Sequence, residues 1–174
     1  IGDSYPWFSR LVASPALNVT LGDVRRYLGN HDGVAERIRQ SLIDQLTRAW
    51  DAGDRVLLIS HSLGSVIAYD SLWHLSREAG HAGRVELFLT MGSPLATRFI
   101  RKGLQGANRA GVERYPDNID HWVNVAARRE MVALHRRVKP FFSGMLKQGA
   151  VQSIEDLPEI YHHFRRDGQL HVHK

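Results

Sequence analysis

The stretch Val56-Leu-Leu-Ile-Ser-His-Ser-Leu-Gly-Ser-Val-Ile-Ala-Tyr69 decides the fold of this chain. It opens with a short run rich in leucine and β-branched residues, which predicts a strand buried on both faces of a sheet. The run passes directly into a helical pattern from Leu63 to Glu78, which ends at Gly80. A strand that becomes a helix within two residues needs a very tight turn, and Ser62 lies at that turn.

Helices and strands alternate on both sides of this stretch. Apolar residues at steps of three and four predict a helix over 34–52, and strands are expected over 84–91 and 119–125. We further expect short helices near 23–28 and 96–103, a loop over 104–118, helical fragments after residue 125, and a last strand at Gln169–Val172. This alternation predicts an α/β fold, in which a mostly parallel sheet is flanked by helices on both sides.

The bulk composition is that of a globular protein. Hydrophobic residues make up 43% and charged residues 24% of 174 residues, enough chain for one domain with a sizeable core. No apolar run approaches the roughly 20 residues of a membrane-spanning helix, and no signal peptide pattern is present. Cysteine is absent, which excludes disulfides and thiolate sites. We expect a cytoplasmic protein, although an exported protein without disulfides would have the same composition.

Positive charge is concentrated in one part of the chain. Between Arg98 and Lys139, ten Lys and Arg residues are opposed by four acids, a net charge of +6, whereas the rest of the chain carries −1. Such a segment is typical of a solvated surface, and it also suits an anionic membrane surface or an acidic partner. It lacks the spacing of an RNA-binding strand and of a zinc finger, so we expect no nucleic acid partner.

Ser62 has the surroundings that a nucleophilic serine at a strand-to-helix turn requires. The turn strains the backbone, so the residues two positions away, Ser60 and Gly64, need to be small. The hydroxyl is then exposed above the sheet edge, and the N–H of Leu63, at the helix N-terminus, is directed toward a developing oxyanion. The alternative is a helix cap without catalytic meaning. His61 adjoins Ser62, and because adjacent side chains point in different directions, we do not assign it as the base.

These residues resemble the nucleophile elbow of the α/β-hydrolase superfamily, in its lipase and esterase members with a His-Ser-Leu-Gly elbow. The family pattern is G-x-S-x-G, and here Ser60 occupies the position of the first glycine. Leu87-Phe-Leu-Thr-Met-Gly-Ser-Pro94 resembles the next core strand and its Gly-Ser-Pro turn, and Trp122-Val-Asn-Val125 resembles the strand after it. The resemblance covers roughly residues 23 to 174 and implies a catalytic triad in the chain order Ser, acid, His.

The resemblance implies a carboxylate after the 122–125 strand, where the family often has an Asp-x-Val-Ala segment. This sequence has Glu130-Met-Val-Ala133 there, and a Glu can orient a histidine as an Asp does. Asp117 and Asp120 precede or lie within the strand and are worse placed. Glu130 also adjoins two arginines, so an ordinary surface ion pair is the alternative interpretation.

The resemblance places the catalytic histidine after the last strand of the fold. The late histidines of the chain are His135, His162, His163, His171 and His173. His135 follows the acid too closely, while His162 and His163 lie in an aromatic-flanked helical piece that suits packing or a surface. We assign His173, which together with His171 brackets the expected last strand, and a base beyond Lys174 is the alternative.

The family fold starts with strands that end in a His-Gly type turn, which supplies the second oxyanion-hole N–H. Nothing before Asp32 resembles that turn, and the chain begins at Ile1 within apparent structure. We therefore expect residues 1–174 to form a single α/β-hydrolase-like domain that is incomplete at its N-terminus and lacks the first strands. The alternatives are that this portion is disordered and omitted, or that the oxyanion hole is incomplete.

Two functions of different classes follow from these residues. The first is a serine hydrolase that cleaves a small-molecule or lipid carboxylic ester with Ser62, Glu130 and His173, or an acyltransferase with the same triad. The second is a non-catalytic module that binds a lipid or protein partner through the basic segment. We expect no cofactor and no metal, because zincin, P-loop and dinucleotide-binding motifs are absent and His171-Val-His173 offers only two ligands.

Overall fold

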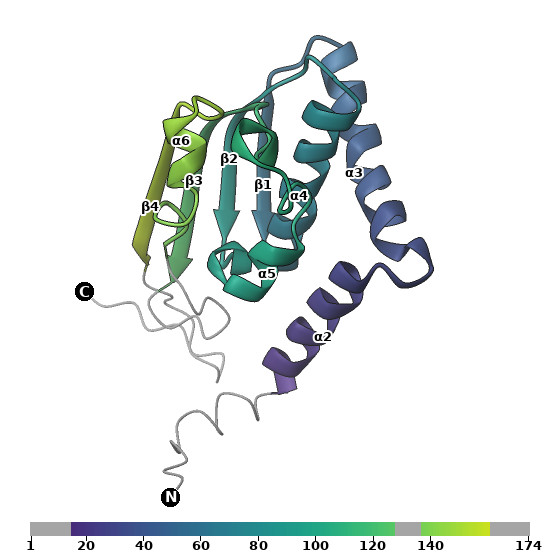
Figure 1. The fold of residues 1–174 in the computed structure, drawn as a ribbon, viewed down its shortest axis with the longest axis vertical. Helices are drawn as coiled ribbons and strands as arrows, with labels where there is room; N and C mark the ends of the chain where they lie inside the picture. The colour runs from purple at the N-terminus through teal and green to yellow at the C-terminus, as the bar shows by residue number, and fades with distance from the viewer. Residues whose placement is uncertain (1–14, 128–136, 161–174) are drawn as a thin grey trace, which may run out of the picture.

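The computed structural model describes residues 15–127 and 137–160, which adopt an α/β fold (Figure 1). Four parallel strands form one sheet in the order of the chain. The strands are β1 (Val56–His61), β2 (Val85–Met91), β3 (Ile119–Ala127) and β4 (Ser153–Ile160). The prediction of an α/β class with a parallel sheet and flanking helices is confirmed. Because all four strands are parallel, their carboxyl ends lie at one edge of the sheet.

Helical segments connect the strands. The α-helices are α2 (Pro15–Gly29), α3 (Val34–Asp51), α4 (Leu63–Trp73), α5 (Arg98–Gly103) and α6 (Ser143–Lys147). The short segments are the 3-10 turns η1 (His31–Gly33), η3 (Pro94–Ala96) and η4 (Gly111–Arg114), and the π-helical η2 (His74–Glu78). The helices predicted over 34–52 and 63–78 are confirmed, and the short helix expected near 23–28 is part of the longer α2.

Within the described ranges, no helix combines the length and the apolar character that crossing a membrane requires. The cytoplasmic location expected from the composition stays a prediction.

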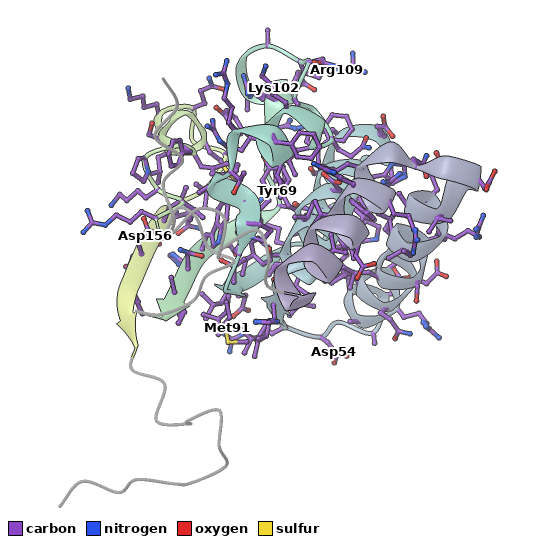
Figure 2. All side chains as sticks on the ribbon, turned by 90° about the horizontal axis from the view of Figure 1, so that it is seen from below. Asp54, Tyr69, Met91, Lys102, Arg109 and Asp156 are labelled. Atoms are coloured by element: carbon purple, nitrogen blue, oxygen red, sulfur yellow. The ribbon has the colours of Figure 1, made fainter. Side chains whose placement is uncertain are left out.

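One face of the sheet carries the hydrophobic core. Leu58, Phe88, Trp122 and Ile154 lie side by side across the four strands, and the last three are fully buried. Tyr69 of α4 packs onto this face, with its ring centroid 6.2 Å from that of Trp122 (Figure 2). Burial of each such side chain stabilises the fold by about 1.5–3 kcal/mol, so α4 is anchored on the core-facing side of the sheet through Trp122 of β3.

The opposite face of the sheet is open: no described helix covers it (Figures 1 and 2). Leu57 is 55% exposed, Ile59 53% and Leu157 47%, and Met91 lies on the same face. The expectations that β1 is buried on both faces and that helices flank both sides are therefore wrong for the described residues. A continuous apolar run shows that a strand is suited to burial on both faces, but it does not show that residues 15–127 and 137–160 cover both faces.

The fourth strand, β4, was not anticipated from the sequence. Its residues, Ser-Ile-Glu-Asp-Leu-Pro-Glu-Ile, include three acids and a proline, which are depleted in strands. The position of β4 at the edge of the sheet accounts for them, because an edge strand has a free side and tolerates a proline. The last strand expected at 169–172 lies outside the described residues, so β4 is the final strand that the structure describes.

A buried polar contact joins α2 to α4. The Tyr27 hydroxyl donates to Asp70 Oδ2 at 2.9 Å, and the Gln105 N–H donates to Asp70 Oδ1 at 2.8 Å. Burial raises the pKa of the Asp70 carboxyl to about 6 despite these two donors. Burial and the neighbouring Asp70 also raise the pKa of the Tyr27 hydroxyl. The ionised form of Asp70 is therefore destabilised in the folded protein.

Candidate active site

Ser62 lies between β1 and α4 in a backbone conformation that side-chain-bearing residues rarely adopt. Its φ of 51° and ψ of −126° correspond to the first central position of a type II′ turn, where glycine dominates. Ser62 does not cap α4, because its side chain makes no capping hydrogen bond and an N-cap residue normally has extended dihedrals. The helix-cap alternative is therefore not supported. Strained residues of this kind cluster at active sites, and the predicted tight turn at Ser62 is present.

Hydrogen bonds hold this turn from both sides. The Ser62 N–H donates to the Met91 carbonyl of β2 at 3.0 Å, and the Ser65 N–H and hydroxyl donate to the Ser62 carbonyl at 3.0 and 2.6 Å. Ser65 Oγ also lies 2.7 Å from Ser93 Oγ, which accepts the Leu95 N–H. Because Ser65 gives its only hydroxyl proton to Ser62, the Ser93 hydroxyl donates to Ser65. The Gly-Ser-Pro turn after β2 thus braces the elbow through Ser65, a residue that the sequence analysis did not single out.

The described structure gives less steric reason for small residues at positions 60 and 64 than the sequence suggested. A Cβ added to Gly64 would meet no atom within 4 Å, so nothing in the described residues requires glycine there. The buried Ser60 Oγ has no hydrogen-bond partner among the described residues. Both Ser60 and Gly64 lie near the outer edge of β1, and no described strand pairs with that edge. The expected steric constraint on Gly64 is thus not confirmed by residues 15–127 and 137–160.

The parallel topology returns the chain to the Ser62 edge after every strand. Residues 128–136, which follow β3, contain Glu130, and residues 161–174, which follow β4, contain His173 and most of the other late histidines. Both segments lie outside the described residues, so the distances from Ser62 to Glu130 and His173 stay predictions. Leu63 is the first residue of α4, as expected for an oxyanion donor.

The two carboxylates considered less suitable lie at the other end of the sheet. Asp120 is the second residue of β3 and pairs with Arg84 at 2.8 Å. Asp117 precedes β3 and pairs with Arg77 at 2.9 Å. Both acids are therefore at the amino ends of the strands, away from Ser62, which agrees with the reasoning that disfavoured them.

Three described histidine rings have partners away from Ser62. They are His74 with Glu78 at 2.7 Å, His81 with Asp51 at 4.0 Å, and His121 with Ser153 at 2.9 Å. The last is a serine–histidine pair, but Ser153 begins an edge strand on the open face, without a strained turn or a helix N-terminus beside it. These three rings therefore do not serve as the base for Ser62.

Four polar side chains form a row across the core-facing side of the sheet, and its member on β1 lies two residues before Ser62. The row consists of Ser60, Thr90, Asn124 and Asp156, which are register partners on β1, β2, β3 and β4. The sequence analysis did not identify this row, because its members are far apart in the chain. The signal that was available is a polar residue two positions after the core-facing apolar residue of each strand, at 58/60, 88/90, 122/124 and 154/156.

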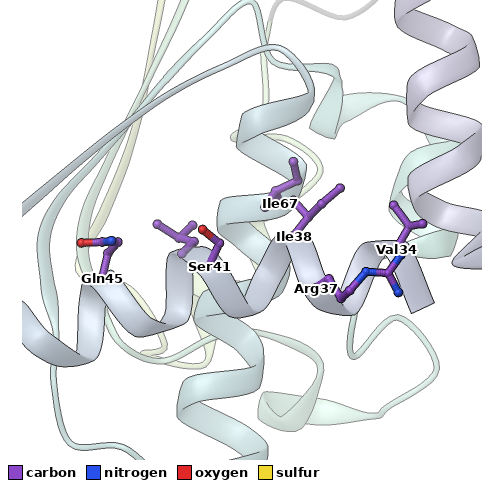
Figure 3. A pocket seen from close by; sticks show the side chains of 7 residues that line it. Val34, Arg37, Ile38, Ser41, Gln45 and Ile67 are labelled. Atoms are coloured by element: carbon purple, nitrogen blue, oxygen red, sulfur yellow. The ribbon is translucent and has the colours of Figure 1, made fainter. Parts of the chain in front are cut away.

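Hollows in the described part of the chain lie away from Ser62, and two of them are sizeable. An apolar groove of about 600 Å³ between α3 and α4 is shown in Figure 3 and is lined by Val34, Arg37, Ile38, Ser41, Leu42, Gln45 and Ile67. A polar cavity of about 400 Å³ adjoins Asp70 and Tyr27. Neither is lined by Ser62 or Leu63, so neither belongs to the candidate site. No cluster of three or more His, Asp or Glu side chains suited to a metal ion occurs in the described part of the chain.

No family model, no curated protein sequence and no solved structure matches the chain. The geometry around Ser62 and the sequence pattern are therefore the observations from which a function can be inferred.

Proposed function

We propose that the protein is a serine hydrolase of the α/β-hydrolase type that cleaves carboxylic esters, with Ser62 as its nucleophile. The observation that carries the proposal is the conformation of Ser62, a strained non-glycine residue between a parallel strand and a buried helix. Helix capping and core packing do not account for the strain, because the Ser62 side chain makes no capping hydrogen bond and is only partly buried. A nucleophile elbow accounts for it, because the turn lifts the hydroxyl above the carboxyl edge of the sheet.

In the proposed reaction, Ser62 Oγ attacks the acyl carbonyl carbon while a histidine accepts the hydroxyl proton. The Leu63 N–H at the start of α4 stabilises the oxyanion that forms. The tetrahedral intermediate collapses, the histidine protonates the leaving alkoxide, and an acyl-enzyme remains. Water, deprotonated by the same histidine, then hydrolyses the acyl-enzyme and restores the Ser62 hydroxyl.

The order of the parallel strands and the resemblance support our choice of the remaining triad members. The nucleophile follows β1, and the acid would follow β3, which is where Glu130 lies in the sequence. The base would follow β4, and His173 is our assignment among the histidines of that segment. Glu130 would accept the second ring N–H of the histidine and orient the ring toward Ser62.

The test is labelling with a fluorophosphonate probe, which reacts with activated serines. We expect wild-type protein to label at Ser62 and Ser62→Ala not to label. Ser153→Ala is the matched control, because it removes a serine that lies next to a histidine but not at a strained turn. Folded wild-type protein that never labels would contradict the proposal. Substituting His162, His163, His171 and His173 one at a time then identifies the base by loss of labelling.

A second candidate is a non-catalytic module that binds an anionic membrane surface. One observation favours it: Phe99 of α5 is 57% exposed between the exposed cations Arg98 and Lys102, a combination suited to a lipid interface. Lys102 and Arg109 project from the same side of the molecule (Figure 2). This candidate predicts sedimentation with phosphatidylserine vesicles that survives Ser62→Ala and is lost in Arg98→Glu/Lys102→Glu. Equal sedimentation of the charge-reversed variant would contradict it.

A further inference from the structure

The polar cavity of about 400 Å³ lies where α2, α3, α4, η2 and α5 meet. Its inner end is formed by Asp70 of α4 and Tyr27 of α2, which are only 1% and 3% exposed. The titratable side chains that line it besides Tyr27 are Glu36, Arg39, Asp70, His74 and Glu78. Ser62 does not line it, so this cavity is separate from the candidate active site.

The π-helical turn η2 contributes two of the lining side chains. In this turn the Ala79 N–H donates to the His74 carbonyl, five residues back, at 2.9 Å, and such turns occur frequently at functional sites. His74 Nδ1 lies 2.7 Å from Glu78 Oε2. The second carboxylate oxygen of Glu78 has no hydrogen-bond partner among the described residues, and because Glu78 is exposed, this oxygen is accessible to a ligand.

The cavity carries more negative than positive charge. Three carboxylates and one guanidinium line it, which gives a formal charge of −2 when His74 is neutral. The Arg39 guanidinium forms no ion pair with them in the described ranges. It lies over the Tyr27 ring, 5.9 Å from the ring centroid, and donates to the Tyr27 hydroxyl at 3.4 Å. Burial raises the pKa of Asp70 to about 6 although Arg39 is near, so the ionised carboxylate lacks a full counter-charge.

A ligand for this lining has to bring positive charge and several hydrogen-bond donors. Each oxygen of Asp70 accepts one hydrogen bond, from Tyr27 and from Gln105, and keeps a lone pair for a further donor. The described acids and histidines do not gather into a group of three suited to a metal ion. An ammonium group supplies a charge and three donors, and a cavity of about 400 Å³ has the size of a small-molecule site.

We propose that this cavity binds a small aliphatic amine in its ammonium form, and that a diamine matches its charge best. One ammonium group lies against Asp70 at the buried inner end. The other lies at the mouth of the cavity, where the exposed carboxylates of Glu36 and Glu78 are found. Buried charges are stabilised when they are paired, so the amine supplies the counter-charge that Asp70 lacks.

The experiment is isothermal titration calorimetry of the full chain with three four-carbon probes at neutral pH and constant ionic strength. The probes are 1,4-diaminobutane, 1,4-butanediol and succinate, which are similar in size and differ in charge. We expect the diamine to bind at least about 10-fold more tightly than the diol, because hydrogen bonds to a charged group contribute most. The whole chain carries a net charge of +5, so its overall field favours succinate, and a preference for the diamine reports the charge of the cavity.

Two variants locate the binding. Asp70→Asn removes the buried carboxylate, and we expect it to weaken diamine binding by about 10- to 100-fold. Glu78→Gln removes an exposed one, and we expect a loss of only about 2- to 5-fold. Asp44→Asn is the matched control, because Asp44 is an exposed acid of α3 that bonds to Gln40 and does not line the cavity. Its affinity for the diamine should equal that of the wild type.

The proposal is overturned if the diamine shows no saturable binding, if succinate binds more tightly than the diamine, or if Asp70→Asn binds as tightly as Asp44→Asn. If Asp70→Asn does not fold, Glu36→Gln/Glu78→Gln decides by the same comparison with the control. No reaction at Ser62 enters this experiment, so its result is independent of the proposed function.

Discussion

Replacing Ser62 with glycine tests the strain at the elbow independently of any reaction. The φ of 51° and ψ of −126° at Ser62 are accessible to glycine without a steric penalty. Alanine keeps the Cβ and therefore keeps the strain, while it removes the same hydroxyl. The comparison of Ser62→Gly with Ser62→Ala therefore isolates the contribution of the backbone conformation.

The expected difference can be worked out from two opposing effects. A side-chain-bearing residue in a sparsely populated region costs about 1–3 kcal/mol, which glycine relieves. Glycine in turn costs about 0.4–1 kcal/mol through the larger entropy of the unfolded chain. At the middle of both ranges, the net gain for Ser62→Gly over Ser62→Ala is about 1.3 kcal/mol. For a domain of this size it corresponds to a melting temperature roughly 3 to 5 °C higher.

The assay is thermal and urea unfolding of both variants, followed by circular dichroism. The control is the same pair of substitutions at Gln45, an exposed position in the middle of α3. There the order must reverse, with Gln45→Gly about 1 kcal/mol less stable than Gln45→Ala, because the helix interior disfavours glycine. If Ser62→Gly is no more stable than Ser62→Ala while the Gln45 pair behaves as expected, the strain argument and the reasoning from it to a nucleophile are wrong.

Three further predictions concern stability and surface. Asp70 has a folded-state pKa of about 6 against an ordinary value of 3.8, so its contribution to stability is fully present below pH 3.8 and is lost as the pH rises through 6. The loss is on the order of 3 kcal/mol. Urea unfolding of wild type and Asp70→Asn between pH 4 and 7 should show this pH dependence only in the wild type, and equal slopes would refute it. Leu57→Thr/Ile59→Thr should lower the fluorescence of an apolar dye bound to the open face of the sheet. Because both side chains are more than half exposed, each substitution should reduce the free energy of unfolding by less than about 0.5 kcal/mol. A large drop in melting temperature would mean that this face is covered. Gly64→Ala should be neutral or stabilising by up to about 1 kcal/mol, because the added methyl meets no atom within 4 Å, and a measured loss above 1 kcal/mol would contradict the open elbow.

The sequence by itself determined the local structure around Ser62. Residues 56–69 combine a short apolar run with an immediate helical pattern, and these two periodicities are set by backbone geometry alone. The tight turn at Ser62 was therefore predictable to the residue, and β2, β3 and α3 were predictable to within two residues at their ends. The missing prediction was β4, because its acids and its proline are tolerated only at a sheet edge, and edge position is not encoded in a local pattern.

The tertiary structure alone decided which side chains meet at the carboxyl edge and which face of the sheet is left open. Ser65 and Ser93 brace the elbow across 28 residues of chain, and Thr90, Asn124 and Asp156 join in one row because parallel register places them side by side. The apolar side chains of β1 looked equally buried in the sequence, yet only the side with Leu58 is packed against α4 in the described residues. Contacts of this kind follow from strand register and layer order, which depend on the whole chain. The turn at Ser62 could therefore be predicted from 14 residues, whereas the side chains that brace it could not.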